Sequence, residues 1–256
     1  RPGNNWFSMK FQQHMDEIRT QHWQHKGALD AAIVDLDGTM VDTLGDFEAA
    51  LNLMLTDLHL PGIDRALIEK LVGKGSEHLI KSVLAHVSVQ RENDGRDQVT
   101  AVDQRFPEAW ASYQRHYLSI NGSRSDVYPG VLEGLASLRE RGLRLACLTN
   151  KPTAFAKPLL ASKGLAGFFD LVFGGDAFER KKPDPLPLLR TCEALGTRPE
   201  RTLMIGDSSN DAQAARAAGC PVVLVTYGYN HGESVLRVDS DAWVDRLDDF
   251  LAMLNR

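Results

Sequence analysis

Four aspartates near the ends of apolar runs could share one chemical site. Asp35 and Asp37 end the run "AAIVDLD". Asp207 ends a later run, "RTLMIGD", and Asp211 follows four residues further on. Close carboxylates repel one another, so either their pKa values rise or a cation lies among them. Because no Cys or His accompanies these acids, their oxygen atoms favour a hard ion such as Mg2+ over zinc.

A threonine and a lysine near other apolar runs would add contacts for a phosphate group. Thr149 and Asn150 end the run "LRLACLTN", and Lys182 lies in the loop "KKPDP". The cation and the lysine would attract a phosphate dianion, to which Thr149 and exposed backbone N–H groups would donate hydrogen bonds. Such a site favours phosphoryl transfer, in which positioning and charge neutralisation do most of the catalytic work.

The first acid pair allows a division of roles. Asp35 would attack phosphorus and form an aspartyl phosphate, while Asp37 would protonate the leaving alkoxide and later deprotonate the attacking water. Gly38 permits a sharp bend that can redirect the second carboxylate away from the first. Unequal environments would then hold the two acids in different protonation states.

Each of these features also has an ordinary structural explanation when it is taken alone. An Asp-x-Asp pair is commonly a turn or a cap, and Thr149-Asn150 could be a strand end followed by a helix cap. Lys182 could be solvated, and Asp207 could begin a helix cap. The order of the motifs and their position after apolar runs favour a functional site.

Short apolar runs predict the strands that would bring these residues together. Their continuous hydrophobicity is typical of strands covered on both faces of a parallel sheet. The segments between them have a helical period, and ligands of such sheets bind beyond the carboxyl ends of the strands. The sequence therefore predicts an α/β fold with a doubly wound, Rossmann-like parallel sheet. The predicted strands lie in "AAIVDLD", "LRLACLTN", "FFDLVFGG", "RTLMIGD" and "CPVVLVTYG".

A helical insert interrupts this pattern after the first strand. Apolar residues recur with a helical period from Thr43 to about Arg124, which predicts a cap of residues 45–124 inserted into a core of residues 27–44 and 125–256. The polar residues 90–97 are expected to form a surface loop within the cap. The break "GKG" inside the cap gives Lys74 two interpretations, a contact to a substrate anion or a solvated turn residue.

Composition excludes several classes of function. The chain has 256 residues with 29 basic and 34 acidic side chains, and it lacks the long basic block expected for nucleic-acid binding. No run of about 18 apolar residues predicts a membrane span, and the polar N-terminus does not resemble a signal peptide, so a cytoplasmic protein is expected. Residues 1–26 are expected to form an N-terminal extension, whose residues 10–26 are polar and would be helical or frayed. Reduced core thiols are expected at Cys147, Cys192 and Cys220.

The segments "DLDGTMVDT", "LTN", "KKPDP" and "GDSSND" resemble the four ordered motifs of the haloacid dehalogenase superfamily of phosphatases. The resemblance extends over most of the chain from residue 28 onward. It implies that Asp35 is the nucleophile and Asp37 the acid and base. It also implies phosphate contacts from Thr149, Asn150 and Gly38. Lys182, or its neighbour Lys181 as an alternative, would neutralise charge.

The same resemblance implies a metal site and a cap. Mg2+ would be held by the carboxylates of Asp35 and Asp207 and the backbone carbonyl of Asp37, with Asp211 in support. The helical insert is similar to the caps that close over small substrates in this superfamily. A small phosphorylated metabolite is therefore the expected partner, and the chain could be a monomer or a homodimer.

One further segment narrows the expected substrate. "CPVVLVTYGYNHGE", residues 220–233, closely resembles the segment after the fourth motif in bacterial phosphoglycolate phosphatases. This implies a Mg2+-dependent hydrolase of 2-phosphoglycolate. Asp37 argues against dehalogenases and the phosphonate-cleaving branch, and Thr39 fits hydrolases better than sugar phosphomutases. The alternatives are a phosphatase for another small metabolite, a sugar phosphomutase, or a phospho-accepting receiver module, which also gathers Asp, Thr and Lys around Mg2+. Lys74 stands at a position where many relatives are expected to have a polar uncharged residue.

Overall fold

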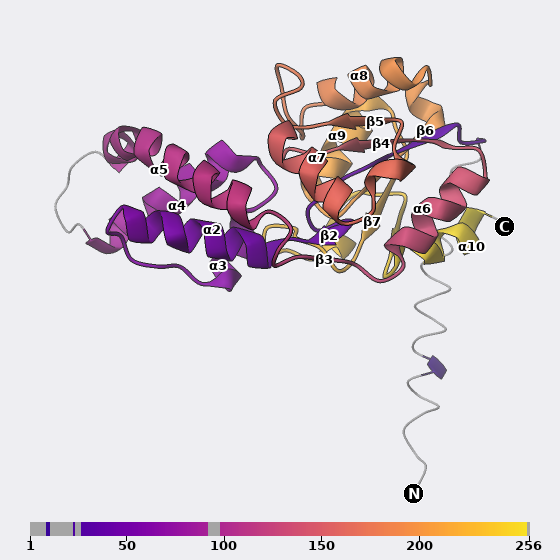
Figure 1. Cartoon of the computed structure of the whole chain (residues 1–256). Helices are drawn as coiled ribbons and strands as arrows, with labels where there is room; N and C mark the ends of the chain where they lie inside the picture. Colours follow the sequence, from indigo (N-terminus) through magenta and orange to yellow (C-terminus); the bar gives the residue numbers. More distant parts are fainter. Residues whose placement is uncertain (1–8, 11–22, 24–26, 92–97, 255–256) are drawn as a thin grey trace, which may run out of the picture.

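The computed structural model describes residues 9–10, 23, 27–91 and 98–254. They form a core built on a parallel sheet, and a group of helices set to one side of it (Figure 1). Most of the N-terminal extension, and residues 92–97 of the expected surface loop, lie outside the described residues.

The core sheet is parallel throughout and has the strand order β5-β4-β1-β6-β7-β8. Each of the five predicted strand segments contains one of these strands, which confirms the predicted α/β class. The sixth, β8, was not predicted. The strands are β1 (Ala31–Val34), β4 (Arg144–Leu148), β5 (Leu171–Phe173), β6 (Thr202–Gly206), β7 (Val222–Val225) and β8 (Ala242–Val244).

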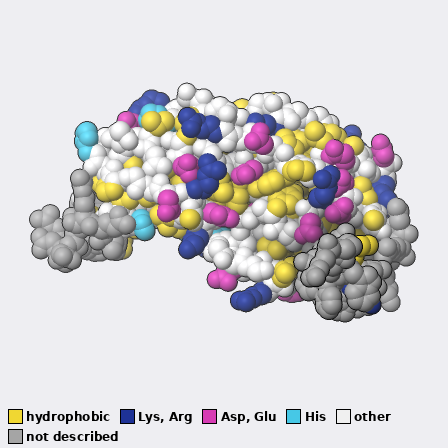
Figure 2. Space-filling view, turned by 90° about the horizontal axis from the view of Figure 1, so that it is seen from below, with side chains coloured by type: hydrophobic (Ala, Val, Ile, Leu, Met, Phe, Trp, Pro, Cys, Tyr) yellow, Lys and Arg dark blue, Asp and Glu magenta, His cyan; other side chains and the backbone are white. Residues whose placement is uncertain are grey.

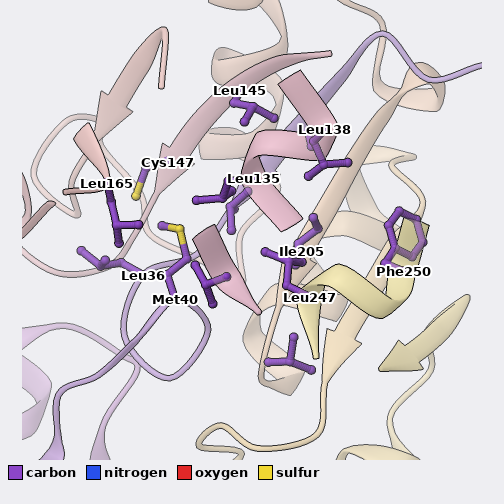
Figure 3. Close-up of a cluster of buried hydrophobic side chains, with 14 of the residues drawn as sticks. Leu36, Met40, Leu135, Leu138, Leu145, Cys147, Leu165, Ile205, Leu247 and Phe250 are labelled. Carbon is purple, nitrogen blue, oxygen red and sulfur yellow. The ribbon is translucent and has the colours of Figure 1, made fainter. Parts of the chain in front are cut away.

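Helices cover both faces of the sheet because alternate residues of each strand point to opposite sides. Ala32 and Val34 of β1 belong to a core with Leu135 and Leu159, whereas Ile33 packs in the opposite core. Figure 3 shows the first core, where Leu135 lies near Ile205. This two-sided burial makes the sheet doubly wound. The helices are α6 (Val131–Glu140), α7 (Thr153–Ser162), α8 (Leu186–Leu195), α9 (Ser209–Ala218) and α10 (Phe250–Leu254).

The register of β1 brings three predicted site residues to one edge. Val34 pairs with Cys147 on one side and with Ile205 on the other. The residues that follow these strands, Asp35, Thr149 and Asp207, therefore lie at the same carboxyl edge of the sheet. The backbone N–H of Asp35 donates to the Ile205 carbonyl at 3.0 Å, which fixes the first acid against the neighbouring strand.

The cap is a set of helices around an apolar core that also includes Phe155 and Tyr229 from the sheet domain. Phe47, Tyr113 and Tyr117 are buried in this core together with aliphatic residues from all four helices. The two chain crossings between core and cap are joined by a short antiparallel pair, β2 (Val41–Asp42) with β3 (Asp126–Val127). The cap helices are α2 (Leu44–Asp57), α3 (Arg65–Leu71), α4 (Ser76–Arg91) and α5 (Gln98–Ile120).

The surface carries mixed charges (Figure 2), and the cysteines are buried free thiols. Lys and Arg side chains are interspersed with Asp and Glu over the face seen in Figure 2. None of the helices in the described part of the chain has both the length and the apolar character needed to cross a bilayer. Cys147, Cys192 and Cys220 are buried free thiols, as predicted.

Candidate active site

A pocket lies between the carboxyl edge of the sheet and the cap. It contains about 500 Å³ of space, including the part open to solvent. Its core residues are Asp35, Asp37, Thr149, Asn150, Lys151, Asp207, Ser208 and Tyr229. Its cap residues are Phe47, Val72, Gly73, Gly75, Ser76 and Leu79.

Asp35 follows the last residue of β1 and is largely buried, with 14 % of its side chain exposed. Its Oδ1 accepts a hydrogen bond from the Leu36 backbone at 2.7 Å and lies 3.2 Å from the Lys182 ammonium. Burial and repulsion from Asp211 raise the pKa of Asp35 to about 7, although Lys182 acts in the opposite direction.

Three of the four aspartates named from the sequence bring their carboxylates together, while the Asp37 side chain lies outside this group. Oxygen atoms of Asp35, Asp207 and Asp211 all lie within 4.8 Å of one another. Burial and repulsion from Asp211 and Asp35 raise the pKa of Asp207 well above its ordinary value. Buried acids that share a site without Cys or His fit a hard cation, which would offset this repulsion.

Asp207 and Asp211 are oriented by hydrogen bonds at the end of β6. Asp207 accepts from the Thr39 hydroxyl at 3.1 Å and from the Tyr229 backbone at 2.7 Å. One oxygen of Asp211 accepts the backbone hydrogens of Asp207 and Ser208 at the start of α9. Asp211 thus both holds the strand end and contributes charge to the cluster.

Lys182 is the buried cation beside the nucleophile candidate. Its ammonium lies 2.8 Å from Asp211, 3.2 Å from Asp35 and 2.9 Å from the Leu148 carbonyl. Burial alone would lower the pKa of Lys182, but the two carboxylates outweigh this effect and raise it. Its neighbour Lys181 is exposed, so the geometry favours Lys182 over the alternative named from the sequence.

Asp37 has partners different from those of Asp35. Its Oδ1 accepts from the Thr43 hydroxyl at 2.7 Å and from the Lys151 ammonium at 2.8 Å. Gly38 makes the bend after it, with a φ of 79°, and a Cβ at this position would lie 2.1 Å from Asp207. The bend therefore separates the two acids of the motif and leaves no room for a side chain beside the carboxylate cluster.

Thr149 and Asn150 both line the pocket, but their side chains have different roles in the fold. Thr149 Oγ1 accepts the Lys151 backbone hydrogen at 3.1 Å. The Asn150 amide donates to the carbonyls of Gly73 and Lys182, both at 2.9 Å, and accepts from the Lys182 backbone at 3.1 Å. Asn150 therefore positions the lysine loop and joins the core to the cap, while its contact to a phosphate stays a prediction.

The structure changes which second lysine belongs to the pocket. Lys74 lies between two lining residues, Gly73 and Gly75, but it is exposed and does not line the pocket itself. Lys151, which sequence reasoning missed, lines the pocket with only 2 % of its side chain exposed. Its position directly after the "LTN" motif was the available signal.

The segment after β7 contacts the surroundings of both Asp207 and Asp37. The Tyr227 hydroxyl donates to the Thr39 carbonyl at 2.6 Å, and Tyr229 lines the pocket. The Tyr229 hydroxyl accepts the Thr43 backbone hydrogen at 3.0 Å. Because Tyr229 binds Asp207 through its backbone and Thr43 through its hydroxyl, this segment links the cluster to the environment of Asp37.

Comparisons with known proteins agree with this geometry. The model of the haloacid dehalogenase-like hydrolase family matches residues 29–219. The phosphoglycolate phosphatase of Thiobacillus denitrificans is 42 % identical over 226 residues, covering 88 % of this chain and 96 % of that protein. The phosphoglycolate phosphatase of Nitrosospira multiformis is also 42 % identical, with the same coverage.

A solved structure gives the same result for the fold. The crystal structure of a predicted phosphoglycolate phosphatase from Haemophilus somnus superimposes with a TM-score of 0.83 at 31 % identity. The superposition covers 90 % of this chain and 99 % of the chain in that crystal structure. The chain belongs to the haloacid dehalogenase-like hydrolase family.

Proposed function

We propose that this protein is a Mg2+-dependent phosphomonoester hydrolase that converts 2-phosphoglycolate to glycolate and phosphate. The observation that carries the proposal is Asp35 in the pocket, 3.2 Å from Lys182 and within the cluster of buried carboxylates. A carboxylate next to a fixed ammonium and a cation site suits attack on a phosphate ester. The names of the relatives from Thiobacillus denitrificans and Nitrosospira multiformis support the choice of ester.

The first half of the reaction transfers the phosphoryl group to Asp35. Its carboxylate oxygen attacks phosphorus, the ester P–O bond breaks, and Asp37 donates a proton to the departing alkoxide. Lys182 offsets negative charge that develops near the attacking carboxylate, and Thr149 donates its hydroxyl hydrogen to a phosphoryl oxygen. The products of this half are the alcohol and an aspartyl phosphate.

The second half returns Asp35 to its starting state. Asp37 removes a proton from a water molecule, which attacks phosphorus; the bond between phosphorus and the Asp35 oxygen breaks, so that inorganic phosphate and the free Asp35 carboxylate are released. Thr43 and Lys151 both donate to Oδ1 of Asp37, and no hydrogen bond to its Oδ2 is recorded from the described residues. We assign the proton exchange to Oδ2, since Oδ1 is held in place by two donors.

The residues of the carboxylate cluster fit Mg2+. Asp35 and Asp207 would hold it together with the backbone carbonyl of Asp37, and Asp211 would support them by fixing Lys182 and the end of β6. The bound ion supplies charge neutralisation between the acids and the phosphate. The side chain of Asp37 stays outside the cluster, which leaves it available for proton transfer.

A panel of phosphate esters tests the proposal. Purified protein with Mg2+ is expected to release phosphate from 2-phosphoglycolate with a higher kcat/KM than from sugar phosphates or other small monoesters. A tenfold preference for another ester, about 1.4 kcal/mol of transition-state binding, would overturn the substrate assignment. A sugar phosphomutase would instead form an isomeric sugar phosphate, and a receiver module would stay phosphorylated without turnover.

A further inference from the structure

We propose that Lys151 binds the carboxylate of the substrate and thereby sets the preference for an acidic phosphate ester. This inference rests on the proposed function, because it concerns the leaving group of the same reaction. It adds a specificity residue that the predicted motif residues do not include.

Lys151 is a buried cation held by two cap rings and one core acid. Its ammonium lies 4.5 Å from the ring centre of Phe47 and 4.7 Å from that of Tyr117. It also donates to Asp37 Oδ1 at 2.8 Å. Ring faces stabilise a cation by their negative quadrupole without accepting a conventional hydrogen bond. The two rings therefore leave part of the hydrogen-bonding capacity of the ammonium unused.

The ammonium group has donors available for a second anion. A lysine has three N–H donors, and Asp37 accepts from Lys151 at one of them. Within residues 27–91 and 98–254 the structure records no other hydrogen-bond acceptor for this ammonium. Lys182 differs, because its ammonium already has Asp211, Asp35 and the Leu148 carbonyl within 3.2 Å. Lys151 is thus the better placed of the two lysines for binding a substrate anion.

The charges around the pocket favour a cation for the substrate carboxylate, in addition to the metal ion proposed for the phosphate. Asp35, Asp37 and Asp207 line the pocket, and among the described lining residues Lys151 is the only lysine or arginine. A substrate carboxylate placed near these acids without a cation would be repelled. A buried lysine next to the leaving group offsets this repulsion, so that an ester with a carboxylate binds better than a neutral one. Lys74 is exposed, so water would compete with its contact to the substrate carboxylate.

The distance from Asp37 places the cation where the substrate carboxylate must lie. Asp37 exchanges a proton with the ester oxygen of the leaving group in the proposed reaction. In 2-phosphoglycolate the carboxylate carbon is two bonds away from that oxygen. Lys151 contacts Asp37 directly, so a leaving group within reach of Asp37 brings its carboxylate close to the Lys151 ammonium. Ser76 and Gly75, at the start of the cap helix α4, line the same pocket and add the positive end of a helix.

The test compares two esters that differ only at the recognised group. Ethyl phosphate has a methyl group where 2-phosphoglycolate has a carboxylate. For wild-type protein and each variant, the measured quantity is the ratio of kcat/KM for 2-phosphoglycolate to that for ethyl phosphate. Any effect of a substitution on Asp37 changes both rates and cancels in the ratio. Lys151→Met is expected to lower the ratio at least tenfold, because a hydrogen bond between charged groups contributes about that factor to binding.

Matched variants separate charge from other effects. Lys151→Gln keeps a donor for Asp37 but lacks the charge, so it is also expected to lower the ratio at least tenfold. Lys151→Arg keeps the charge and is expected to retain more of the preference than either neutral variant. Lys157→Met removes an exposed lysine of α7 and is expected to change the ratio less than threefold. Lys74→Met tests the lysine suggested by the sequence and is expected to behave like Lys157→Met.

The outcomes distinguish this inference from the proposed function. If wild-type protein prefers 2-phosphoglycolate and a folded Lys151→Met or Lys151→Gln variant keeps that preference, the inference is wrong and the function stands. If wild-type protein does not prefer 2-phosphoglycolate over ethyl phosphate, the substrate assignment itself fails. Binding affinity, measured in the Asp35→Asn background, gives a second readout. There, Lys151→Gln should weaken the binding of 2-phosphoglycolate at least tenfold more than the binding of ethyl phosphate. Equal weakening of both ligands would contradict the inference.

Discussion

Asp35 and Asp37 are two residues apart in the sequence, but they belong to two different electrostatic environments. Asp35 lies with Lys182, Asp207 and Asp211, whereas Asp37 contacts Thr43 and Lys151. The sequence predicted that the pair would divide its roles, because two close acids cannot share one environment and both stay charged. It could not predict Lys151 as a partner, since that contact joins residues 114 positions apart.

Replacing Asp37 tests the division of roles. Asp37→Asn retains the side-chain shape but cannot exchange a proton, so turnover is expected to fall about 10²–10⁴-fold. Phosphoryl transfer to Asp35 needs less help when the leaving group is a weak base such as 4-nitrophenolate. Mass spectrometry of the quenched variant with 4-nitrophenyl phosphate should therefore detect phosphate on Asp35. An unmodified Asp35 together with undiminished turnover would rule out this role for Asp37.

The pH dependence of stability tests the cation site without an activity assay. In the metal-free protein the pKa values of Asp35, about 7, and Asp207 are raised above their unfolded values. At these two acids the folded state binds more protons than the unfolded state, so the stability that they contribute falls as the pH rises from about 4 to 7. The increase in Tm caused by Mg2+ is expected to grow over this range. A Tm increase that does not depend on pH would contradict a cation among these acids.

At the scale of elements, the site depends on strand ends and on the bends that follow them. The apolar runs predicted five strands, and the parallel pattern predicted that their carboxyl ends would meet. Residues 242–244 were missed because "AWV" is a short run between polar residues and gives little periodicity. The hydrogen bonds from Tyr227 and Tyr229 were also beyond sequence reasoning, because they depend on how the segment after β7 folds back.

Two glycines with similar backbone angles separate strain from function. Gly38 and Gly142 have φ values of 79° and 81°. A Cβ at Gly38 would lie 2.1 Å from Asp207, whereas one at Gly142 would have nothing within 4 Å. Backbone strain alone is expected to cost each alanine variant about 1–2 kcal/mol of unfolding free energy in urea denaturation, and the clash with Asp207 adds to the loss in Gly38→Ala. Only Gly38→Ala is expected to lose activity, by at least about a hundredfold, and similar activities of the two variants would contradict this account of the bend.

At the scale of the whole molecule, the cap and the core form the pocket together. Asn150 and Asn210 of the core both donate to the Gly73 carbonyl of the cap, at 2.9 and 3.3 Å. The sequence predicted a helical insert from its change of periodicity, and it predicted the core acids from their motifs. From the "GKG" break it left Lys74 as either a contact to a substrate anion or a solvated turn residue, and it did not name Lys151, which lines the pocket. The local sequence around Lys151 does not show that rings of the distant cap helices cover its side chain.

The position of the pocket under the cap predicts a limit on substrate size. The pocket lies between the cap and the edge of the sheet, so it is expected to admit a small ester but not a folded protein surface. The kcat/KM for a phosphotyrosine peptide is expected to be at least about a hundredfold below that for 2-phosphoglycolate, a difference of roughly 2.7 kcal/mol. Comparable values for the two substrates would show that the cap does not restrict access.

The most direct test of the central claim is phosphate release from 2-phosphoglycolate by the Asp35→Asn variant. Because the substitution removes the attacking carboxylate but preserves its size, kcat is expected to fall at least about ten-thousandfold. The far-ultraviolet circular dichroism and Tm should remain close to those of the wild-type protein. Substantial hydrolysis by this folded variant would contradict the assignment of Asp35 as the nucleophile, and with it the mechanism proposed for the protein.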